Sequence, residues 1–600
     1  MEFIAHNFVP LLFAGLLLFL LTGFPVAFSL AATGLTFGLI GMGVGLFPQT
    51  LFQALPLRIF GIMQNDTLLA VPFFTLMGIV LERSGMAEDL LETVGQVFGP
   101  LRGGLALATI FVGALLAATT GVIAAAVISM GLISLPIMLR YGYHRTVATG
   151  VIVASGTLAQ IIPPSLVLIV MADQLGRSVG DMYAGAIVPG LLLVGLFALF
   201  IVILAIVRPD WVPALPPEAR IYKEPNGASG HRSLLVVLLL SVLAALAWAA
   251  VHGTVLNPLL GRQGDAPLDE VLTLAMMAAA FFALVLALAN RWLGLGLLSQ
   301  LTERVVFVLL PPLVLIFLVL GTIFLGIATP TEGGAMGASG ALVMAVSRRR
   351  LGFDLLKQAL DNTARLSCFV MFILIGATVF SFTFNAADGH LFVEHLFAKL
   401  PGGPLGFLIA VNLLVFFLGC FLDFFEIAFI VIPLLVGVAE KLGIDLVWFG
   451  VIIGMNLQTS FLSPPFGFAL FYLRSVAPRF EYADRVTNRS IPAVTTAQIY
   501  QGAALFIALQ LVMLALVLSF PNLVTDRIDK APKVSLESIK LEAETGDYGS
   551  APDANVPQAL TPQSAEDKVA PQAEGDAEEE DPLAAVQRAI EQDAKNRKKK

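Results

Sequence analysis

Charged residues are scarce in this 600-residue chain: they make up 13% of it, against 57% hydrophobic residues, and the mean hydropathy is +0.87. Soluble domains carry about 25% charged residues, so this composition excludes a soluble globular protein. The only cysteines, Cys368 and Cys420, lie in apolar segments and form neither a metal-binding nor a redox pattern. Phosphate-binding, nucleic-acid-binding and hydrolytic motifs are missing, and the chain has no room for the nucleotide domain of an ATP-driven pump.

Uncharged apolar sequence, by contrast, is abundant. Stretches long enough to cross about 30 Å of hydrocarbon recur along the chain, for example at residues 26–47, 182–207 and 503–520. We therefore predict an all-α polytopic membrane protein, and we expect that it is not an enzyme. Residues 526–600 differ, because 17 acidic and 11 basic residues among Pro, Ala and Gln indicate a disordered acidic tail. A docking role for this tail is the alternative to a dispensable extension.

Two long segments, about 300 residues apart, share the same order of features. LRGGLALATIFVGALLAATTGVIAAAVISMGLISLPIMLRYGY begins at Leu101, and LPGGPLGFLIAVNLLVFFLGCFLDFFEIAFIVIPLLVGVAEKLGI begins at Leu400. Each passes a small-residue or polar interruption and an Ile/Leu-Pro, and then reaches a glycine that precedes a Pro-Pro pair, at Pro163 or Pro464. Halves that repeat in this way are typical of secondary transporters.

Each repeat contains an apolar segment of about 35 residues whose centre is poor in helix formers, at 117–122 and at 418–423. Such a segment is too long for one tilted span, so we predict a re-entrant hairpin in each half of an inverted repeat. The predicted first repeat, at 1–233, contains a hairpin at about 104–138 and a Pro-Pro broken helix at about 145–172. The predicted second repeat, at 304–525, contains a hairpin at about 404–440 and a Pro-Pro broken helix at about 446–475. Peripheral spans at 234–303 separate the two repeats, and the tail follows at 526–600.

Basic residues are distributed unevenly among the predicted loops. If the first hairpin enters from the cytoplasm and the second from the opposite side, 19 of the 24 Lys and Arg residues before the tail face the cytoplasm. This positive-inside bias favours that orientation over its mirror image, with both termini outside. The basic residues left outside are Arg58, Arg177, Arg262, Lys399 and Lys441.

Each Pro-Pro pair follows a group of hydroxyl and amide side chains. Two prolines in succession should unwind a helix at mid-membrane, because each removes a backbone donor and clashes with the preceding turn. The freed carbonyls and nearby side-chain oxygens can coordinate a hard cation such as Na⁺ near the hairpin tips. A simple proline kink is the alternative. The candidate Na⁺ ligands are Thr119, Thr120, Gly121, Ser155, Gly156, Thr157, Pro163, Gly419, Asp423, Asn456, Gln458 and Thr459.

Ionisable residues inside the membrane are costly and are therefore functional candidates. Asp423 and Glu426 lie three residues apart at the inner turn of the second hairpin, and Glu332 follows the ATPTE break. The alternative for Asp423 is a buried helix cap, and Thr331 with Glu332 can equally form an ordinary helix N-terminus. The candidate substrate residues are Thr120, Ser155, Thr331, Glu332, Asp423 and Glu426.

Several motifs resemble one known family. LLAVPFFTLMGIVLERSG, GTLAQIIPPSLVLIV, GAIVPGLLL, ATPTEGGAMGA and GMNLQTSFLSPPFGFALF are similar to the DctM-type large membrane subunit of tripartite ATP-independent periplasmic (TRAP) transporters, over roughly residues 8–525. GALLAATTGVIAAAVISMGLISLPIMLRYGY and GCFLDFFEIAF resemble the branch labelled mannitol/chloroaromatic compound transport. The first hairpin departs from the family pattern, because AATTG stands where most members have a Ser-Gly-Ser-Ser-like tip.

The resemblance implies a Na⁺-coupled importer with an elevator-type ion transporter fold in the bacterial inner membrane, with Na⁺ as the coupling ion. It also implies a small four-helix membrane subunit and a periplasmic substrate-binding protein as partners, and a small organic acid as substrate. The alternative is a stand-alone ion-coupled organic anion carrier without a binding protein. An intramembrane hydrolase using Asp423 and Glu426 is disfavoured, because the sequence offers no recognisable catalytic constellation around them.

Overall fold

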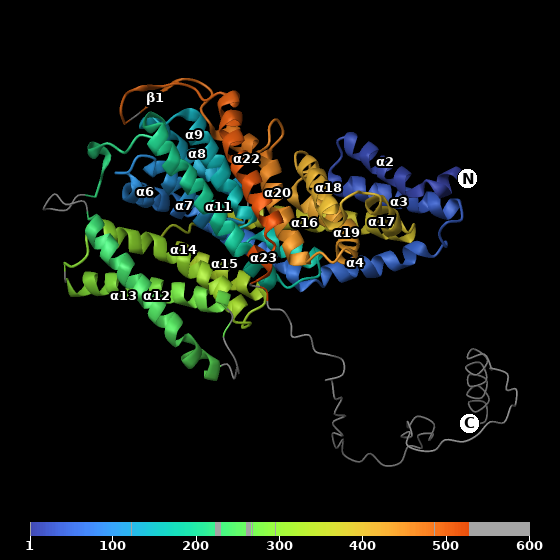
Figure 1. Ribbon diagram of the computed structural model, residues 1–600, viewed down its shortest axis with the longest axis horizontal. Coiled ribbons are helices and arrows are strands. Elements are labelled where there is room, and N and C mark those ends of the chain that lie inside the picture. The colour runs from blue at the N-terminus through green and yellow to red at the C-terminus, as the bar shows by residue number, and fades with distance from the viewer. Residues whose placement is uncertain are drawn as a thin grey trace, which may run out of the picture. The chain divides into compact units, whose positions relative to one another are not determined.

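The computed structural model describes residues 2–526 and 528, except 122, 223–229, 260–265, 267, 295 and 485. The chain divides into two units, Met1–Ala531 and Pro532–Lys600. The second unit, which includes most of the predicted acidic tail, lies outside the described residues. The described part is almost entirely helical (Figure 1), which confirms the predicted all-α class.

From the N-terminus to residue 207 the chain forms α-helices with three short 3-10 turns between them. Their bounds are α1 Glu2–His6, α2 Phe8–Leu21, α3 Val26–Gly43, η1 Leu51–Ala54, α4 Leu55–Met63, η2 Asp66–Leu69, α5 Ala70–Arg83, α6 Met86–Phe98, α7 Gly104–Thr120, α8 Ile123–Arg140, α9 Arg145–Thr157, η3 Leu158–Gln160, α10 Leu166–Gln174 and α11 Val179–Val207.

A middle section follows, and then a second series of helices. The middle section comprises η4 Pro209–Trp211, η5 Pro217–Ala219, α12 His231–Leu259 and α13 Leu268–Leu293. The second series comprises α14 Gln300–Phe324, α15 Pro330–Ser347, α16 Phe353–Ala386, α17 Gly389–Ala398, α18 Gly403–Leu418, α19 Phe424–Lys441, α20 Leu446–Leu462, α21 Phe468–Val476, β1 Tyr482–Ala483, β2 Ser490–Ile491, α22 Thr496–Ser519 and α23 Asn522–Thr525. Strands β1 and β2 pair in antiparallel register.

Eight helices of the described part are long and apolar enough to cross a membrane, so the protein is a multi-pass membrane protein. The two helical series follow the same order at a spacing of about 300 residues. α7 and α8 correspond to α18 and α19, α9 and α10 to α20 and α21, and α11 to α22. The last match is also visible in sequence, because YAGA at Tyr183 recurs as YQGA at Tyr500.

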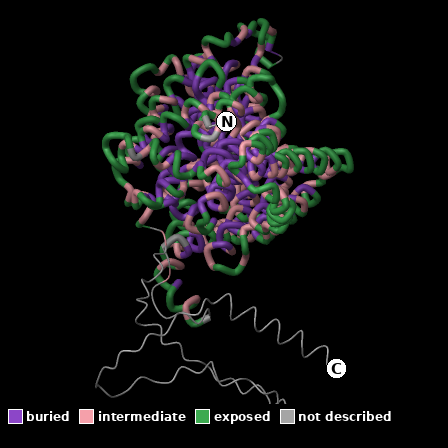
Figure 2. Tube along the Cα trace, turned by 90° about the vertical axis from the view of Figure 1, so that its right-hand side faces the viewer, coloured by how far each residue is buried: buried purple, intermediate pink, exposed green. Residues whose placement is uncertain are grey.

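Helices α9 and α22 approach each other closely because glycines face one another. A Cβ on Gly150 would lie 2.6 Å from the carbonyl oxygen of Gly502, a distance that no side chain tolerates. Buried residues run through the centre of this unit, whereas peripheral helices are largely exposed (Figure 2). α12 is an example, because it is one of the most apolar helices and yet is almost entirely exposed. Such a surface is suited to lipid contact.

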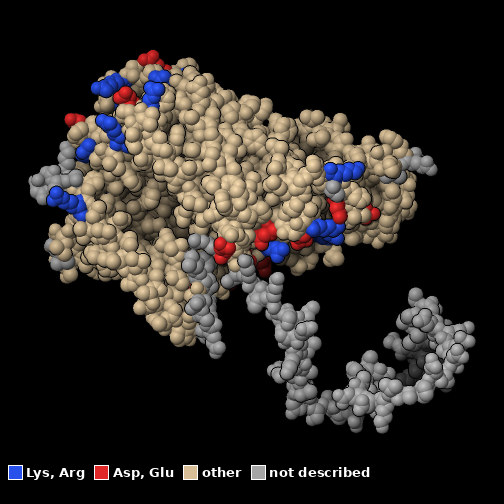
Figure 3. Space-filling model, in the orientation of Figure 1, with Lys and Arg blue, Asp and Glu red and all other residues tan. Residues whose placement is uncertain are grey.

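Basic residues from distant parts of the chain meet at common acidic partners. Arg304, Arg348 and Arg350 all lie within 3.7 Å of the Asp89 carboxylate. Arg140, at the end of α8, pairs with Asp484 in the loop between β1 and β2. On the face drawn in Figure 3, Lys and Arg side chains gather over the end that carries α6, α8 and β1 in Figure 1. Further Lys and Arg side chains lie together with Asp and Glu toward the other end of the same face, so the positive-inside orientation stays a prediction (Figure 3).

Candidate ion and substrate site

The first Pro-Pro pair divides one helical path into two. α9 ends at Thr157 and tightens into η3, and α10 begins only at Leu166. Between them lies Pro163–Pro164, joined by a cis peptide bond. Neither proline can donate a backbone hydrogen bond, which favours a helix break at this position. Ser165 starts the next helix, because its hydroxyl accepts a hydrogen bond from the Val167 amide at 3.2 Å.

The second Pro-Pro pair divides the matching helix. α20 ends at Leu462 and α21 begins at Phe468, and the Pro464–Pro465 bond between them is also cis. The chain turns back sharply at Gly467, where a Cβ would lie 2.4 Å from the carbonyl oxygen of Phe461. Only glycine fits this turn without a backbone shift. Both predicted helix breaks therefore occur at their proline pairs.

The tip of the first predicted hairpin lies against the start of α10. Gly121 has φ +60°, the left-handed conformation in which helices commonly end, and a Cβ there would lie 3.3 Å from the Leu166 amide nitrogen. Thr119 is buried, and its hydroxyl donates to the Leu116 carbonyl at 3.0 Å. A hydroxyl that donates in this way still has lone pairs to offer. The side chain of Thr120 lies outside the described part of the structure.

The tip of the second predicted hairpin is closed by a capping box at the start of α19. The Asp423 carboxylate accepts a hydrogen bond from the Phe424 amide at 2.7 Å, and the Glu426 carboxylate accepts one from the Asp423 amide at 2.9 Å. The tip lies against α20, because a Cβ on Gly419 would lie 2.2 Å from the Ser460 hydroxyl oxygen. Capping leaves room for a second role, since a carboxylate offers about four lone-pair sites.

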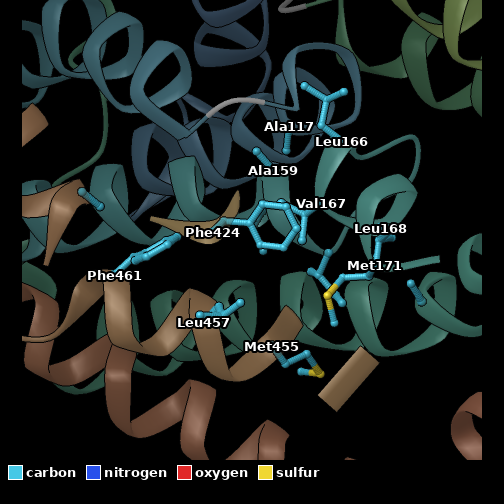
Figure 4. Close-up of a cluster of buried hydrophobic side chains, with 14 of the residues drawn as sticks. Ala117, Ala159, Leu166, Val167, Leu168, Met171, Phe424, Met455, Leu457 and Phe461 are labelled. Carbon is cyan, nitrogen blue, oxygen red and sulfur yellow. The ribbon is translucent and has the colours of Figure 1, made fainter. Parts of the chain in front are cut away.

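An apolar cluster lies where the hairpin tips and the broken helices meet (Figure 4). The labelled side chains come from five different elements, α7, η3, α10, α19 and α20, and Phe424 lies beside Val167 in this view. These side chains belong to both halves of the chain, which therefore share one buried centre. The labelled residues are Ala117, Ala159, Leu166, Val167, Leu168, Met171, Phe424, Met455, Leu457 and Phe461.

Two amide side chains reach Thr157 from different helices. The Nε2 atoms of Gln458 on α20 and Gln510 on α22 lie 3.4 and 3.5 Å from Thr157 Oγ1. The Thr157 hydroxyl itself donates to the Ala154 carbonyl at 2.9 Å. Sequence reasoning singles out Thr157 and Gln458 but misses Gln510, because one amide in an apolar helix forms no motif. Its place here depends on the close packing of α22 against α9.

Several buried polar atoms in the same elements have no partner among the described residues. Among the described residues they include the Ser155 hydroxyl, both ends of the Gln160 amide, and the amide oxygens of Gln458 and Gln510. An unpaired buried polar group costs about 1–3 kcal/mol. A bound cation or ordered water is the usual partner of such groups. Several neutral side-chain oxygens without a hydrogen-bond partner therefore lie in the elements on both sides of the helix breaks.

Other predicted Na⁺ ligands support the helices around this centre. Asn456 donates to the Asn412 carbonyl at 2.6 Å and so joins α20 to α18. The Thr459 hydroxyl donates to the Met455 carbonyl within its own helix at 3.2 Å. Gly156 allows α9 to approach α8, because a Cβ there would lie 2.3 Å from a methyl carbon of Val127. These contacts bring elements of the site together.

Two of the predicted substrate residues lie at another turn. The Thr331 hydroxyl donates to the Asp66 carbonyl in η2 at 2.5 Å, and Glu332 closes a capping box at the start of α15. Within the described residues, no hydrogen bond joins either side chain to a hairpin tip. The η2 turn is nevertheless linked to the first broken helix, because Asn65 donates to Asp173 at the end of α10 at 2.8 Å.

Comparison with known proteins gives consistent matches. The family described as "Tripartite ATP-independent periplasmic transporter, DctM component" matches residues 13–523. The chain is similar to the C4-dicarboxylate TRAP transporter large permease protein DctM of Pseudomonas aeruginosa, with 28% identity over 432 residues that cover 72% of this chain and 82% of the relative.

Two further relatives carry other substrate names. The sialic acid TRAP transporter large permease protein SiaM of Vibrio cholerae is 26% identical over 462 residues, 76% of this chain and 87% of the relative. The isethionate TRAP transporter permease protein DctMQ of Oleidesulfovibrio alaskensis is 25% identical over 471 residues, 78% of this chain and 60% of the relative.

Proposed function

This chain belongs to the DctM family of tripartite ATP-independent periplasmic (TRAP) transporters, and from that premise we propose that it imports a small organic acid together with Na⁺. It is a large permease component of such a transporter, and the relatives it matches are permeases. The observation that carries Na⁺ coupling is the pair of matched helix breaks flanked by buried, unpartnered oxygens. Unwound backbone and half-helix ends are how secondary transporters build ion sites.

An organic anion suits the same centre. Helices α8, α10, α19 and α21 all begin at the hairpin tips or helix breaks, and their N-terminal ends carry partial positive charge. The relatives' names refer to C4-dicarboxylates, sialic acid and isethionate, which are all organic anions. Of the predicted substrate residues, Ser155 and Asp423 lie in elements of this centre, and Glu426 caps beside Asp423. Bound Na⁺ would offset the charge of such a substrate.

We further propose that transport proceeds by an elevator movement. The two hairpins and broken helices would move as one body against a scaffold that includes α3, α5 and α14–α16. Ser129 on α8 and Glu82 on α5 lie across that boundary, with their side-chain oxygens 3.0 Å apart. In a background without Cys368 and Cys420, a bifunctional thiol-specific reagent that joins Ser129→Cys to Glu82→Cys should abolish uptake and leave assembly intact. Each single variant treated with the same reagent is the control, and full activity in the cross-linked double variant would contradict the movement.

The proposed setting is the bacterial inner membrane, with a small four-helix membrane subunit and a periplasmic substrate-binding protein as partners. Residues 1–233 and 304–525 would be inverted repeats, with 234–303 peripheral. The mannitol/chloroaromatic branch label stays a prediction. Dependence on a binding protein separates this proposal from the stand-alone carrier. If uptake continues after the binding protein is left out, the stand-alone alternative is favoured.

Na⁺ coupling is tested by uptake into proteoliposomes that contain the chain and its partners. Radiolabelled organic acids, beginning with succinate and sialic acid, serve as probes, selected by their binding to the partner binding protein. We expect uptake to require an inward Na⁺ gradient. Equal uptake when choline replaces Na⁺ would overturn the coupling.

A further inference from the structure

Gln510 is a buried amide in the middle of α22, a helix without a proline break. Gln510 is only 1% exposed, and its amide oxygen has no hydrogen-bond partner among the described residues. Its amide nitrogen lies 3.5 Å from the Thr157 hydroxyl oxygen. Burying an amide with so few partners is unfavourable, and an apolar side chain of similar size would avoid that cost. Packing alone therefore does not account for a glutamine here.

The repeat shows which apolar residue fits such a helix. When YAGA at Tyr183 is aligned with YQGA at Tyr500, Leu193 of α11 is the residue that corresponds in sequence to Gln510 of α22. Leu193 is fully buried, so the matching position accepts an apolar side chain. Thr157 and Gln458 are also matching positions, each six residues before the first proline of its pair. Gln510 therefore adds a third polar side chain where the repeat alone supplies two.

The distances around Thr157 are informative. The amides of Gln458 and Gln510 lie 3.4 and 3.5 Å from its hydroxyl oxygen, beyond the usual N–H···O range of about 2.7–3.2 Å. Two oxygens that bind one ion at right angles, each about 2.4 Å away as around Ca²⁺, lie about 3.4 Å apart. A half-turn of a glutamine amide about its last torsion places its oxygen where its nitrogen was. After such a turn, each amide oxygen would lie about 3.4–3.5 Å from the Thr157 hydroxyl oxygen, at the spacing of two ligands of one ion.

We propose that Gln510 is a Na⁺ ligand, and that with Thr157 and Gln458 it forms a cation site at the crossing of α9, α20 and α22. The inference rests on the proposed Na⁺ coupling and extends it to a helix outside the hairpins and broken helices. All three ligands are neutral, in keeping with the described residues, which contain no cluster of three His, Cys, Asp or Glu side chains able to hold a metal ion. Neutral oxygens suit a monovalent ion that must leave again in each transport cycle.

The test is a Na⁺ titration of the melting temperature of the purified full chain, with choline chloride keeping the ionic strength constant. An ion that binds the folded state raises the melting temperature as its concentration rises. Gln510→Met keeps an unbranched side chain but has no oxygen, so we expect the Na⁺ concentration at half-maximal shift to rise about tenfold. Gln510→Glu keeps a side-chain oxygen at this position and adds a negative charge, so the midpoint should fall below the wild-type value.

Gln501→Met, at an exposed position of the same helix, is the matched control and should keep the wild-type midpoint. A wild-type midpoint in Gln510→Met would overturn the site and leave Na⁺ coupling standing. A wild-type chain that shows no response to Na⁺ would overturn the coupling itself. If Gln510→Met does not fold, Gln510→Glu decides: a midpoint lowered below wild type supports the site, and a raised or unchanged midpoint contradicts it.

Discussion

The two Pro-Pro breaks lie at matching positions of the chain but in different surroundings. Pro163–Pro164 is buried, whereas Pro464–Pro465 is exposed. The matching tyrosines follow the same division: the Tyr183 hydroxyl donates to the Ser165 carbonyl in the interior, and the Tyr500 hydroxyl donates to the Pro465 carbonyl at the surface. The local sequence breaks both helices in the same way, but only the first break is enclosed.

The second helix of each predicted hairpin ends in an ion pair, and the ion pair of the first half is again the more buried one. Arg140 ends α8 and pairs with the buried carboxylate of Asp484 at 2.9 Å, whereas Lys441 ends α19 and pairs with Glu394 at 2.5 Å with both side chains more exposed. Equivalent positions in a repeat can therefore contribute very different free energies.

The largest expected effect concerns the charge at the hairpin tips, since Asp423 has no acidic counterpart in AATTG. Asp423→Asn keeps an oxygen for the Phe424 amide but removes the charge, so we expect Na⁺-dependent uptake to fall about tenfold or more with assembly intact. Glu426→Gln should be milder, because an amide oxygen can still accept from the Asp423 amide. Uptake is compared at matched membrane expression.

Wild-type uptake and Na⁺ affinity in Asp423→Asn would make Asp423 a structural cap. The proposed ligands of the second half would then reduce to Asn456, Gln458 and Thr459. The two hairpin tips would also be more alike in function than their charges indicate.

The second largest expected effect is a difference in stability loss between substitutions at the buried first break and at the exposed second break. The buried Ser165 hydroxyl caps α10, and its one proton can go to the Ala159 or the Gln160 carbonyl, whose oxygens lie 2.9 and 3.0 Å away. Ser165→Ala should destabilise the fold by about 1–3 kcal/mol, because these groups lose a buried partner. Phe466 is the matching residue and is 47% exposed, so Phe466→Ala should change stability by about 0.5 kcal/mol or less. Thermal unfolding in detergent compares them, and equal losses would remove the distinction.

The matched ion pairs give a pH-dependent comparison. Burial raises the pKa of Asp484, but hydrogen bonds from Thr487 and Arg140 outweigh it and bring this pKa to about 2. Because the folded pKa is below the unfolded value near 3.9, the stabilisation is complete above about pH 4 and is lost as the pH falls toward 2. Asp484→Asn should therefore cost about 1–2 kcal/mol at pH 7 and progressively less below pH 4.

Lys441→Met is the control for that ion pair. Its partner Glu394 belongs to an exposed pair, which typically contributes about 0–1 kcal/mol. Melting temperatures are measured from pH 7 down to pH 3 in the same detergent. A larger loss in Lys441→Met than in Asp484→Asn would reverse the expected order of the two halves.

The smallest effect concerns the matching tyrosines. Tyr183→Phe removes a buried hydroxyl whose hydrogen bond is long, at 3.5 Å, so we expect a loss of about 0.5–1 kcal/mol. Tyr500→Phe removes an exposed hydroxyl for which water can substitute, and we expect a change of a few tenths of a kcal/mol, roughly the scatter of surface substitutions. Thermal melts of both variants decide the order, and a greater loss in Tyr500→Phe would count against the enclosure of the first half.

The positions of the helix breaks could be predicted from sequence only in part, because a third Pro-Pro pair, Pro311–Pro312, lies inside the continuous helix α14. Proline removes a donor wherever it stands, and glycine adopts the left-handed turn at Gly121 without help from its neighbours. The all-α class was predicted from the long uncharged apolar stretches and the family from short motifs, and both can be recognised without knowing how the helices pack. The helix cap at Asp423 could also be predicted from sequence, because a capping box spans only four residues.

The sequence by itself thus determined the class and the repeat order of this protein, and it marked the proline pairs at which helices can break. Tertiary structure alone decided which half is enclosed, because identical local signals at Pro163 and Pro464 end in different surroundings. It also decided that Gln510 meets Thr157, a contact between residues 353 positions apart that depends on the glycine contact between α9 and α22. Burial and long-range contacts are properties of the packed chain, so no local pattern of residues encodes them.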